Sequence, residues 1–152
     1  MDQANTDLLS FIRLNEGLRL KPYRCPAGKW TIGVGYNMEA HGIPGWMVDK
    51  IMSGRGITEQ DSDRLLIEEV AKCISACKSI VPGFSGLSHN RQIALVDMCF
   101  NLGPGGLSKF RNMLAAITAG DWERAARSAQ SSKWYTQVKM RGVRVVKMLR
   151  DG

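Results

Sequence analysis

Glu16 is the first side chain in this sequence that combines a reactive type with a suggestive position. The apolar residues of 7–15 recur with helical spacing, and Gly17 can end that helix because glycine tolerates the left-handed conformation. We therefore expect Glu16 at a helix C-terminus, where the helix dipole opposes a carboxylate. Partial burial there would raise its pKa and keep the carboxyl protonated as a general acid, although many glutamates simply end helices.

Other patterns that could carry chemistry are weak or missing in this sequence. His41 and His89 stand far apart and near no pair of carboxylates, and no side chains have the short spacing of zinc ligands. We therefore expect neither a metal nor a cofactor. Gly33-Val34-Gly35 lies in a strand pattern and is not a dinucleotide-binding fingerprint, and no GxSxG nucleophile elbow occurs.

The four cysteines form no CxxC pair and no regular framework; they are Cys25, Cys73, Cys77 and Cys99. Cys73 and Cys77 are one helical turn apart, but two thiols alone rarely hold a metal. We expect free thiols, as is usual in a reducing compartment.

The elements that must position these residues indicate an α+β fold. Residues 18–39 alternate at several places and are rich in β-forming side chains, which predicts a small antiparallel sheet. A tight turn is expected near Pro26-Ala27-Gly28, and the HGIPG segment at 41–45 is expected to be a connector.

From residue 58 onward the hydrophobic spacing is helical. Thr58 and Asp61 resemble a capping box, and the helix that they begin is about 22 residues long and closes at Pro82. Ser88 is expected to cap a second helix that ends near Gly103-Pro104-Gly105-Gly106. Further helices fit residues 108–118, 121–129 and 138–150.

Length and composition bound the class of protein. A chain of 152 residues allows one domain, for which we expect a sheet lobe over 16–57, a helical lobe of 1–15 and 82–152, and a connecting helix over 58–81. The 44% apolar and 23% charged residues are typical of a globular protein. The apolar runs are too short to span a bilayer, and the first residues lack the basic and apolar regions of a signal peptide, so we expect synthesis in the cytoplasm without an export address.

The net charge of +7 is concentrated near the C-terminus, where residues 101–152 hold 10 basic and 3 acidic side chains. A basic surface attracts polyanions without naming them. At this point the basic charge has several interpretations. It can serve to bind nucleic acid, anionic lipid or the anionic bacterial envelope, or it can serve solubility alone.

A longer series of residues runs through most of the chain in order. It comprises Glu16-Gly17-Leu18-Arg19-Leu20-Lys21, Tyr23, Gly28, Trp30-Thr31-Ile32-Gly33-Val34-Gly35, Ile57-Thr58, Asn101-Leu102-Gly103, Asp121-Trp122-Glu123, Ala125-Ala126, Trp134-Tyr135 and Arg141-Gly142-Val143-Arg144. This series closely resembles the phage-type lysozymes, the endolysins of the T4 lysozyme family. The resemblance implies a single lysozyme-like domain over residues 1–152, with the active cleft between its lobes. It also implies hydrolysis of the β-1,4 bond between N-acetylmuramic acid and N-acetylglucosamine in bacterial peptidoglycan.

The family's catalytic pattern is a Glu, eight residues, an Asp or Cys, five residues and a Thr, and here it falls on Glu16, Cys25 and Thr31. The resemblance implies that Glu16 protonates the leaving glycosidic oxygen. It implies that Cys25 and Thr31 act on the water or on the developing positive charge.

The resemblance also implies side chains that bind substrate, namely Phe100, Asn101, Asn37, Ser128 and Arg141. Arg141 looks like the family arginine that packs near the catalytic Glu. The four tryptophans could stack on sugar rings, but core packing fits Trp122 and Trp134 better because they lie in helical patterns.

Cys25 departs from the best-known family member, which has Asp there. Glycoside hydrolases normally use two carboxyl groups, and an ordinary thiol is only a few per cent thiolate near neutrality. Three interpretations of Cys25 follow. It can be a base or nucleophile with a lowered pKa, or it can only orient water together with Thr31. In the third interpretation the catalytic site is damaged.

We therefore expect a phage muramidase that lyses its host, acting as a monomer on peptidoglycan glycan strands, with no nucleic acid partner and no stable membrane insertion. Without a signal peptide it would wait in the host cytoplasm and depend on a phage holin to reach the periplasm and cell wall. The alternatives are a lytic transglycosylase that acts on the same bond, and a non-catalytic module of the same fold that binds wall or nucleic acid.

Overall fold

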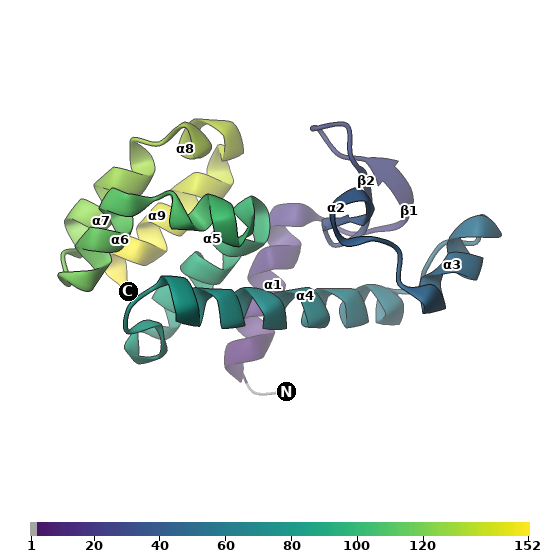
Figure 1. The fold of residues 1–152 in the computed structure, drawn as a ribbon, viewed down its shortest axis with the longest axis horizontal. Coiled ribbons are helices and arrows are strands. Elements are labelled where there is room, and N and C mark those ends of the chain that lie inside the picture. Colours follow the sequence, from purple (N-terminus) through teal and green to yellow (C-terminus); the bar gives the residue numbers. More distant parts are fainter. Residues whose placement is uncertain (1–2) are drawn as a thin grey trace. The chain divides into compact units, whose positions relative to one another are not determined.

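The computed structural model describes residues 3–152 and has the expected α+β architecture (Figure 1). In chain order the elements are α1 (Gln3–Glu16), β1 (Arg19–Arg24), β2 (Trp30–Gly33), β3 (Tyr36–Asn37), α2 (Met38–His41), α3 (Gly45–Met52), α4 (Glu59–Ile80), the 3-10 turn η1 (Phe84–Gly86), α5 (His89–Ser108), α6 (Arg111–Thr118), α7 (Trp122–Gln130), α8 (Lys133–Val138) and α9 (Met140–Asp151).

The chain divides into two compact units. We call Leu9–Glu69 the sheet unit, and the described residues up to Leu8 together with Val70–Gly152 the helical unit. The lobe boundaries expected from the sequence stay a prediction.

The sheet unit contains the expected antiparallel sheet, with strand order β1-β2-β3. β1 and β2 are joined by the expected tight turn, in which the Gly28 N–H donates to the Cys25 carbonyl oxygen at 2.7 Å. Behind the sheet lies a core whose buried members are Ile32, Tyr36, Met38, Met47, Ile57 and Leu65. The expected connector at 41–45 is shorter in the structure, because α2 ends at His41 and α3 begins at Gly45.

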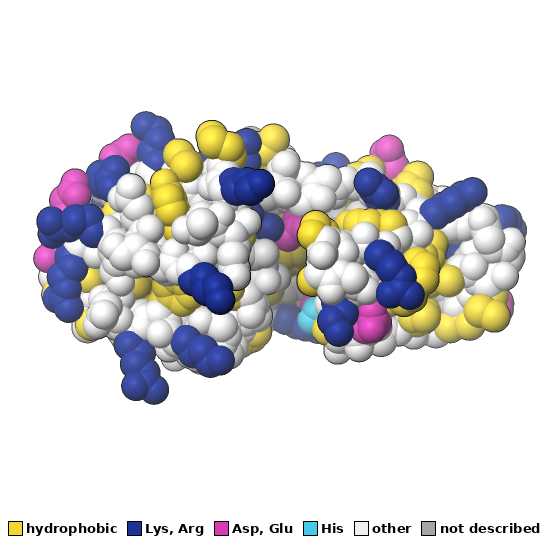
Figure 2. Space-filling view, turned by 90° about the horizontal axis from the view of Figure 1, so that it is seen from above, with side chains coloured by type: hydrophobic (Ala, Val, Ile, Leu, Met, Phe, Trp, Pro, Cys, Tyr) yellow, Lys and Arg dark blue, Asp and Glu magenta, His cyan; other side chains and the backbone are white. Residues whose placement is uncertain are grey.

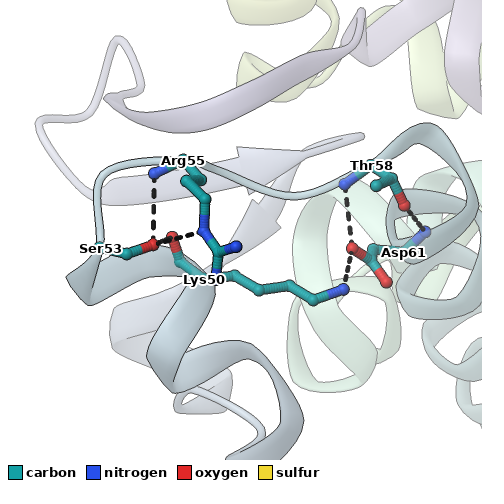
Figure 3. Close-up of polar contacts among 5 residues, drawn as sticks. All are labelled: Lys50, Ser53, Arg55, Thr58 and Asp61. Carbon is teal, nitrogen blue, oxygen red and sulfur yellow. Dashed lines mark hydrogen bonds and ion pairs between the residues drawn. The ribbon is translucent and has the colours of Figure 1, made fainter.

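The start of α4 confirms the capping box (Figure 3). The Thr58 N–H donates to Asp61 Oδ2 at 2.9 Å, and the Asp61 N–H donates to Thr58 Oγ1 at 3.1 Å. Lys50 of α3 donates to the same Asp61 oxygen at 2.6 Å, and this ion pair lowers the pKa of Asp61. The helix then runs for 22 residues, so its predicted length is confirmed.

The helical unit is built around α5, whose residues from Ile93 to Cys99 are all buried. The helix that begins after Ser88 breaks near Gly103, as predicted, because Gly103 has a non-helical φ of 78°; a second helical stretch, not predicted from the sequence, then continues to Ser108. Helices α6, α7 and α9 lie where the spacing predicts them. The short helix α8, capped by the Ser132 hydroxyl, was not predicted from the sequence.

Candidate active site

Glu16 is the last residue of α1, as its neighbour Gly17 predicts. Gly17 has a φ of 76°, and its N–H donates to the Arg13 carbonyl oxygen at 2.8 Å, which closes the helix. The Glu16 side chain is half-buried and lies against the backbone of Gly35, between β2 and β3. A Cβ built on Gly35 would be 2.6 Å from Glu16 Oε2, so the carboxyl group occupies space that only a glycine leaves open.

Cys25 lies half-buried in the turn between β1 and β2, where its N–H donates to the Lys29 carbonyl oxygen at 2.9 Å. Burial raises the pKa of the Cys25 thiol, but hydrogen bonds from the backbone N–H groups of Lys29 and Ala27 and from the Thr31 hydroxyl outweigh it, and the net pKa is lowered. Because the thiolate is the nucleophilic form of cysteine, this turn makes Cys25 more reactive than an ordinary thiol.

Thr31 is buried in β2, with 3% of its surface exposed. Its hydroxyl has one proton, so it can donate a hydrogen bond either to the Lys29 carbonyl oxygen at 3.0 Å or to the Cys25 sulfur. Thr31 is opposite Tyr23 on β1 and opposite Asn37 on β3. Directly opposed residues share one face of a sheet, so these three side chains form a row across it.

Tyr23 connects this row to the catalytic candidates, a role that the sequence analysis did not assign to it. Burial raises the pKa of Tyr23, and the negative charges of Glu16 and Cys25 raise it further, while Arg19 lowers it. The Arg19 guanidinium lies 4.7 Å from the centre of the tyrosine ring. The strand register is the signal that links Tyr23 to Thr31.

Asn37 is the last residue of this row, and its side chain stabilises the start of α2. Its side-chain oxygen accepts hydrogen bonds from the N–H groups of Glu39 and Ala40, each at 3.0 Å, and so caps α2. A role for Asn37 in substrate binding stays a prediction.

The remaining predicted substrate contacts belong to the helical unit. Asn101 accepts a hydrogen bond from Trp134 Nε1 at 2.8 Å, and the Trp134 ring is buried edge-on against Phe110. Trp134 therefore packs in the core, as expected, and it orients Asn101. Phe100, the residue before Asn101, is half-buried.

Arg141 forms a buried pair with Asp97. Arg141 Nε and Nη2 each donate to one Asp97 carboxylate oxygen at 2.9 Å, and the exposed fractions of the two residues are 8% and 0%. The sequence analysis missed Asp97, although an acidic residue within the apolar run of 93–99 is a signal of a buried partner. Whether Arg141 also binds substrate stays a prediction.

Ser128 lies in a polar hollow of the helical unit that is also lined by Asn112, Arg124, Arg127, Ser131 and Ser132. Figure 2 shows Lys and Arg side chains spread over the visible face of this unit. Apart from the buried Arg141, the basic residues of the C-terminal third are exposed or partly exposed.

Within residues 3–152, no set of three or more His, Cys, Asp or Glu side chains is arranged to hold a metal ion. His41 Nδ1 lies 3.6 Å from a Glu69 oxygen, and His89 Nε2 lies 3.3 Å from an Asp7 oxygen. None of the helices in this range is long and apolar enough to cross a membrane.

A carboxyl group at a helix end beside a small sheet, joined in sequence to a mainly helical unit, defines a lysozyme-like protein. The family model for phage lysozyme matches residues 13–150, and the chain belongs to this family of lysozyme-type hydrolases. It is similar to the pre-baseplate central spike protein Gp5 of Enterobacteria phage T4, with 33% identity over 99% of this chain and 29% of that protein.

Other relatives are closer in length. Probable T4-type lysozyme 2 of Dictyostelium discoideum is 25% identical over 97% of this chain and 95% of its own. The endolysin of Acyrthosiphon pisum secondary endosymbiont phage 1 is 29% identical over 90% of this chain and 82% of its own. The chain thus spans less than a third of the spike protein and most of the two lysozyme-type relatives.

Proposed function

We propose that this protein is a phage endolysin that hydrolyses the β-1,4 bond between N-acetylmuramic acid and N-acetylglucosamine in peptidoglycan. The single observation that carries the proposal is the position of Glu16, whose carboxyl group is held against Gly35 beside the row of Tyr23, Thr31 and Asn37. Family membership and the names of the lysozyme and endolysin relatives support the same assignment.

In this mechanism Glu16 is the general acid that donates a proton to the leaving glycosidic oxygen. Cys25, with its lowered pKa, and Thr31 act on the attacking water or on the developing positive charge. The hydrogen bonds in the turn support the interpretation of Cys25 as a base or nucleophile, because they lower its pKa and so favour the thiolate form that those roles use.

On the helical unit, Phe100, Asn101, Ser128 and Arg141 are the proposed contacts to the glycan. Asn101 is the best supported of them, because the hydrogen bond from Trp134 fixes its side-chain oxygen and the residue is exposed. The proposal also includes action as a monomer, and passage from the host cytoplasm to the wall through a phage holin.

The decisive experiment is the digestion of purified peptidoglycan with the wild type and with Glu16→Gln, followed by mass spectrometry of the fragments. Reducing muramic acid ends that appear with the wild type and vanish with Glu16→Gln support the hydrolase. Anhydro-muramic ends would instead assign a lytic transglycosylase, and full activity of a folded Glu16→Gln protein would overturn the role of Glu16. Binding of the protein to the wall without release of any peptidoglycan fragments would instead support the non-catalytic binding module.

A further inference from the structure

The polar hollow of the helical unit is lined by side chains from two helices that pack against each other. Asn112 comes from the first turn of α6, and Arg124, Arg127 and Ser128 come from α7. The spacing of three and four residues places the last three side chains on one face of α7. The hollow has a volume of about 620 Å³, and since a water molecule occupies roughly 30 Å³ in the liquid, it has room for a polyatomic ligand.

The charge in this hollow is positive and is not balanced by the protein itself. Among the described residues that line it, none is acidic. Glu123, the neighbour of Arg124, pairs elsewhere, because its Oε1 lies 3.5 Å from Arg150 Nε. Within residues 3–152 the guanidinium groups of Arg124 and Arg127 have neither an ion pair nor a hydrogen bond. Two like charges three residues apart on a helix repel each other, so an anion bound between them would relieve this repulsion.

We propose that this hollow binds a terminal phosphate group, either as the free phosphate ion or as the phosphomonoester headgroup of a lipid. A phosphomonoester carries a charge of about −1.5 to −2 at pH 7, which matches the two arginines. Guanidinium groups bind phosphate oxygens through paired N–H donors, and the Asn112 amide and the Ser128 hydroxyl add further donors. A carboxylate has one charge and two oxygens in a plane, so a single guanidinium satisfies it; donors from two helices fit the tetrahedral phosphate better.

This site is separate from the proposed catalytic groups, since none of Glu16, Cys25 and Thr31 lines the hollow. Ser128 is also a proposed glycan contact, so the test leaves Ser128 unchanged, varies only the two arginines and measures phosphate binding in the absence of glycan. The inference therefore goes beyond the proposed function, and its outcome does not depend on hydrolysis of peptidoglycan.

The experiment titrates the purified protein with inorganic phosphate at constant ionic strength, with chloride as the replaced anion, and follows the amide signals by NMR. The expected result is saturable binding with shifts confined to the hollow. Arg124→Gln with Arg127→Gln should weaken the binding about tenfold or more, because charge-assisted hydrogen bonds are lost. Lys78→Gln with Lys109→Gln is the matched control: it removes two exposed charges of the same unit outside the hollow and should change the affinity by less than about twofold.

Lipid vesicles distinguish the two sources of the phosphate group. Vesicles with phosphatidic acid present a phosphomonoester, and vesicles with phosphatidylglycerol, matched for surface charge, present only a diester. Preference for phosphatidic acid that depends on the two arginines and is displaced by inorganic phosphate would assign the lipid headgroup. Saturable binding of inorganic phosphate without that preference would assign the free ion.

Two results would overturn the proposal. One is a titration of the wild type that does not saturate or that shifts signals over the whole basic surface. The other is an equal loss of affinity in the arginine and lysine double variants, which would mean attraction by net charge alone. The first result needs no variant, so the folding of a variant does not decide the outcome.

Discussion

The carboxyl group of Glu16 lies directly on the backbone of Gly35. A Cβ at position 35 would be 2.6 Å from Oε2 and 2.7 Å from Cδ of Glu16, and the glycine itself has a left-handed φ of 63°. Glu16 at the end of α1 therefore packs directly against Gly35 in the turn after β2. Any side chain at position 35 must displace the proposed general acid.

Gly35→Ala should therefore reduce peptidoglycan hydrolysis by roughly tenfold to a hundredfold, because a displacement of about 1 Å is enough to misplace a catalytic group. Gly54→Ala is the matched control, since Gly54 has a similar φ of 76° but open space around its Cα and lies outside the Cys25 turn. Both variants should lose comparable stability from the strained φ, and only the first should lose activity in a turbidity assay. Wild-type rates for Gly35→Ala would show that the position of the Glu16 carboxyl does not limit the reaction.

Cys25 should remain a thiolate at lower pH than an ordinary cysteine, because its pKa is lowered in the folded protein. The pH dependence of its alkylation by iodoacetamide, followed by peptide mass spectrometry, should have a lower midpoint in the folded protein than in denaturant. Thr31→Val removes one of the hydrogen bonds and should move the midpoint up. Identical midpoints in the folded and unfolded protein would contradict the effect of the turn.

If Cys25 is the base or nucleophile, the acidic limb of the activity profile should follow its thiolate fraction. Cys25→Asp should then extend activity to lower pH, because an aspartate ionises at about pH 4. Cys25→Ala should be nearly inactive. Full activity of Cys25→Ala on purified peptidoglycan would show that the thiol is not catalytic.

The Asp97–Arg141 pair should be a major determinant of stability. Asp97→Ala removes the carboxylate that pairs with the buried Arg141 guanidinium and should cost about 3–5 kcal/mol in the free energy of unfolding, measured with denaturant. Arg64→Ala breaks the exposed Arg64–Glu68 pair, whose side chains are 56% and 50% exposed, and should cost less than about 1 kcal/mol. A small effect of Asp97→Ala would shift the role of Arg141 away from structure and toward substrate.

Lys139, between α8 and α9, has a φ of 54° and a ψ of −120°, a conformation that favours glycine. Lys139→Gly should raise the free energy of unfolding by about 1 kcal/mol, because the strain of the lysine is removed. Lys133→Gly, in the first turn of α8, should instead lower it by up to about 1 kcal/mol. Thermal unfolding of both variants would test the difference in sign.

The basic residues of the helical unit should make activity on whole walls sensitive to salt. The rate should fall as the Debye length shrinks to about 8 Å and below, because the attraction to an anionic wall is screened. Arg124→Gln with Arg127→Gln should flatten this dependence, while Lys21→Gln with Arg55→Gln, in the sheet unit, should alter it less. A flat salt profile of the wild type would remove the proposed role of the charge.

The sequence by itself determined the features that depend on neighbouring residues. Helix ends at Glu16-Gly17 and at Thr58, the tight turn before Gly28, and the antiparallel sheet all follow from local propensity and hydrogen bonding along the chain. The order of the family's motifs also named Glu16, Cys25 and Thr31. The short helix α8 was not predicted because its few residues carry too little periodicity, and the same holds for the helical stretch that resumes after the predicted break at Gly103.

Tertiary structure alone decided what lies next to these residues. The fold brings together Gly35 and Glu16, Tyr23 and Thr31, and Asp97 and Arg141, and the two members of each pair are separated along the chain. Such contacts arise from strand register and from the packing of separate helices, which no local spacing specifies. The sequence therefore indicates which groups could do chemistry, and the fold determines the space, the hydrogen bonds and the pKa shifts that equip them for it.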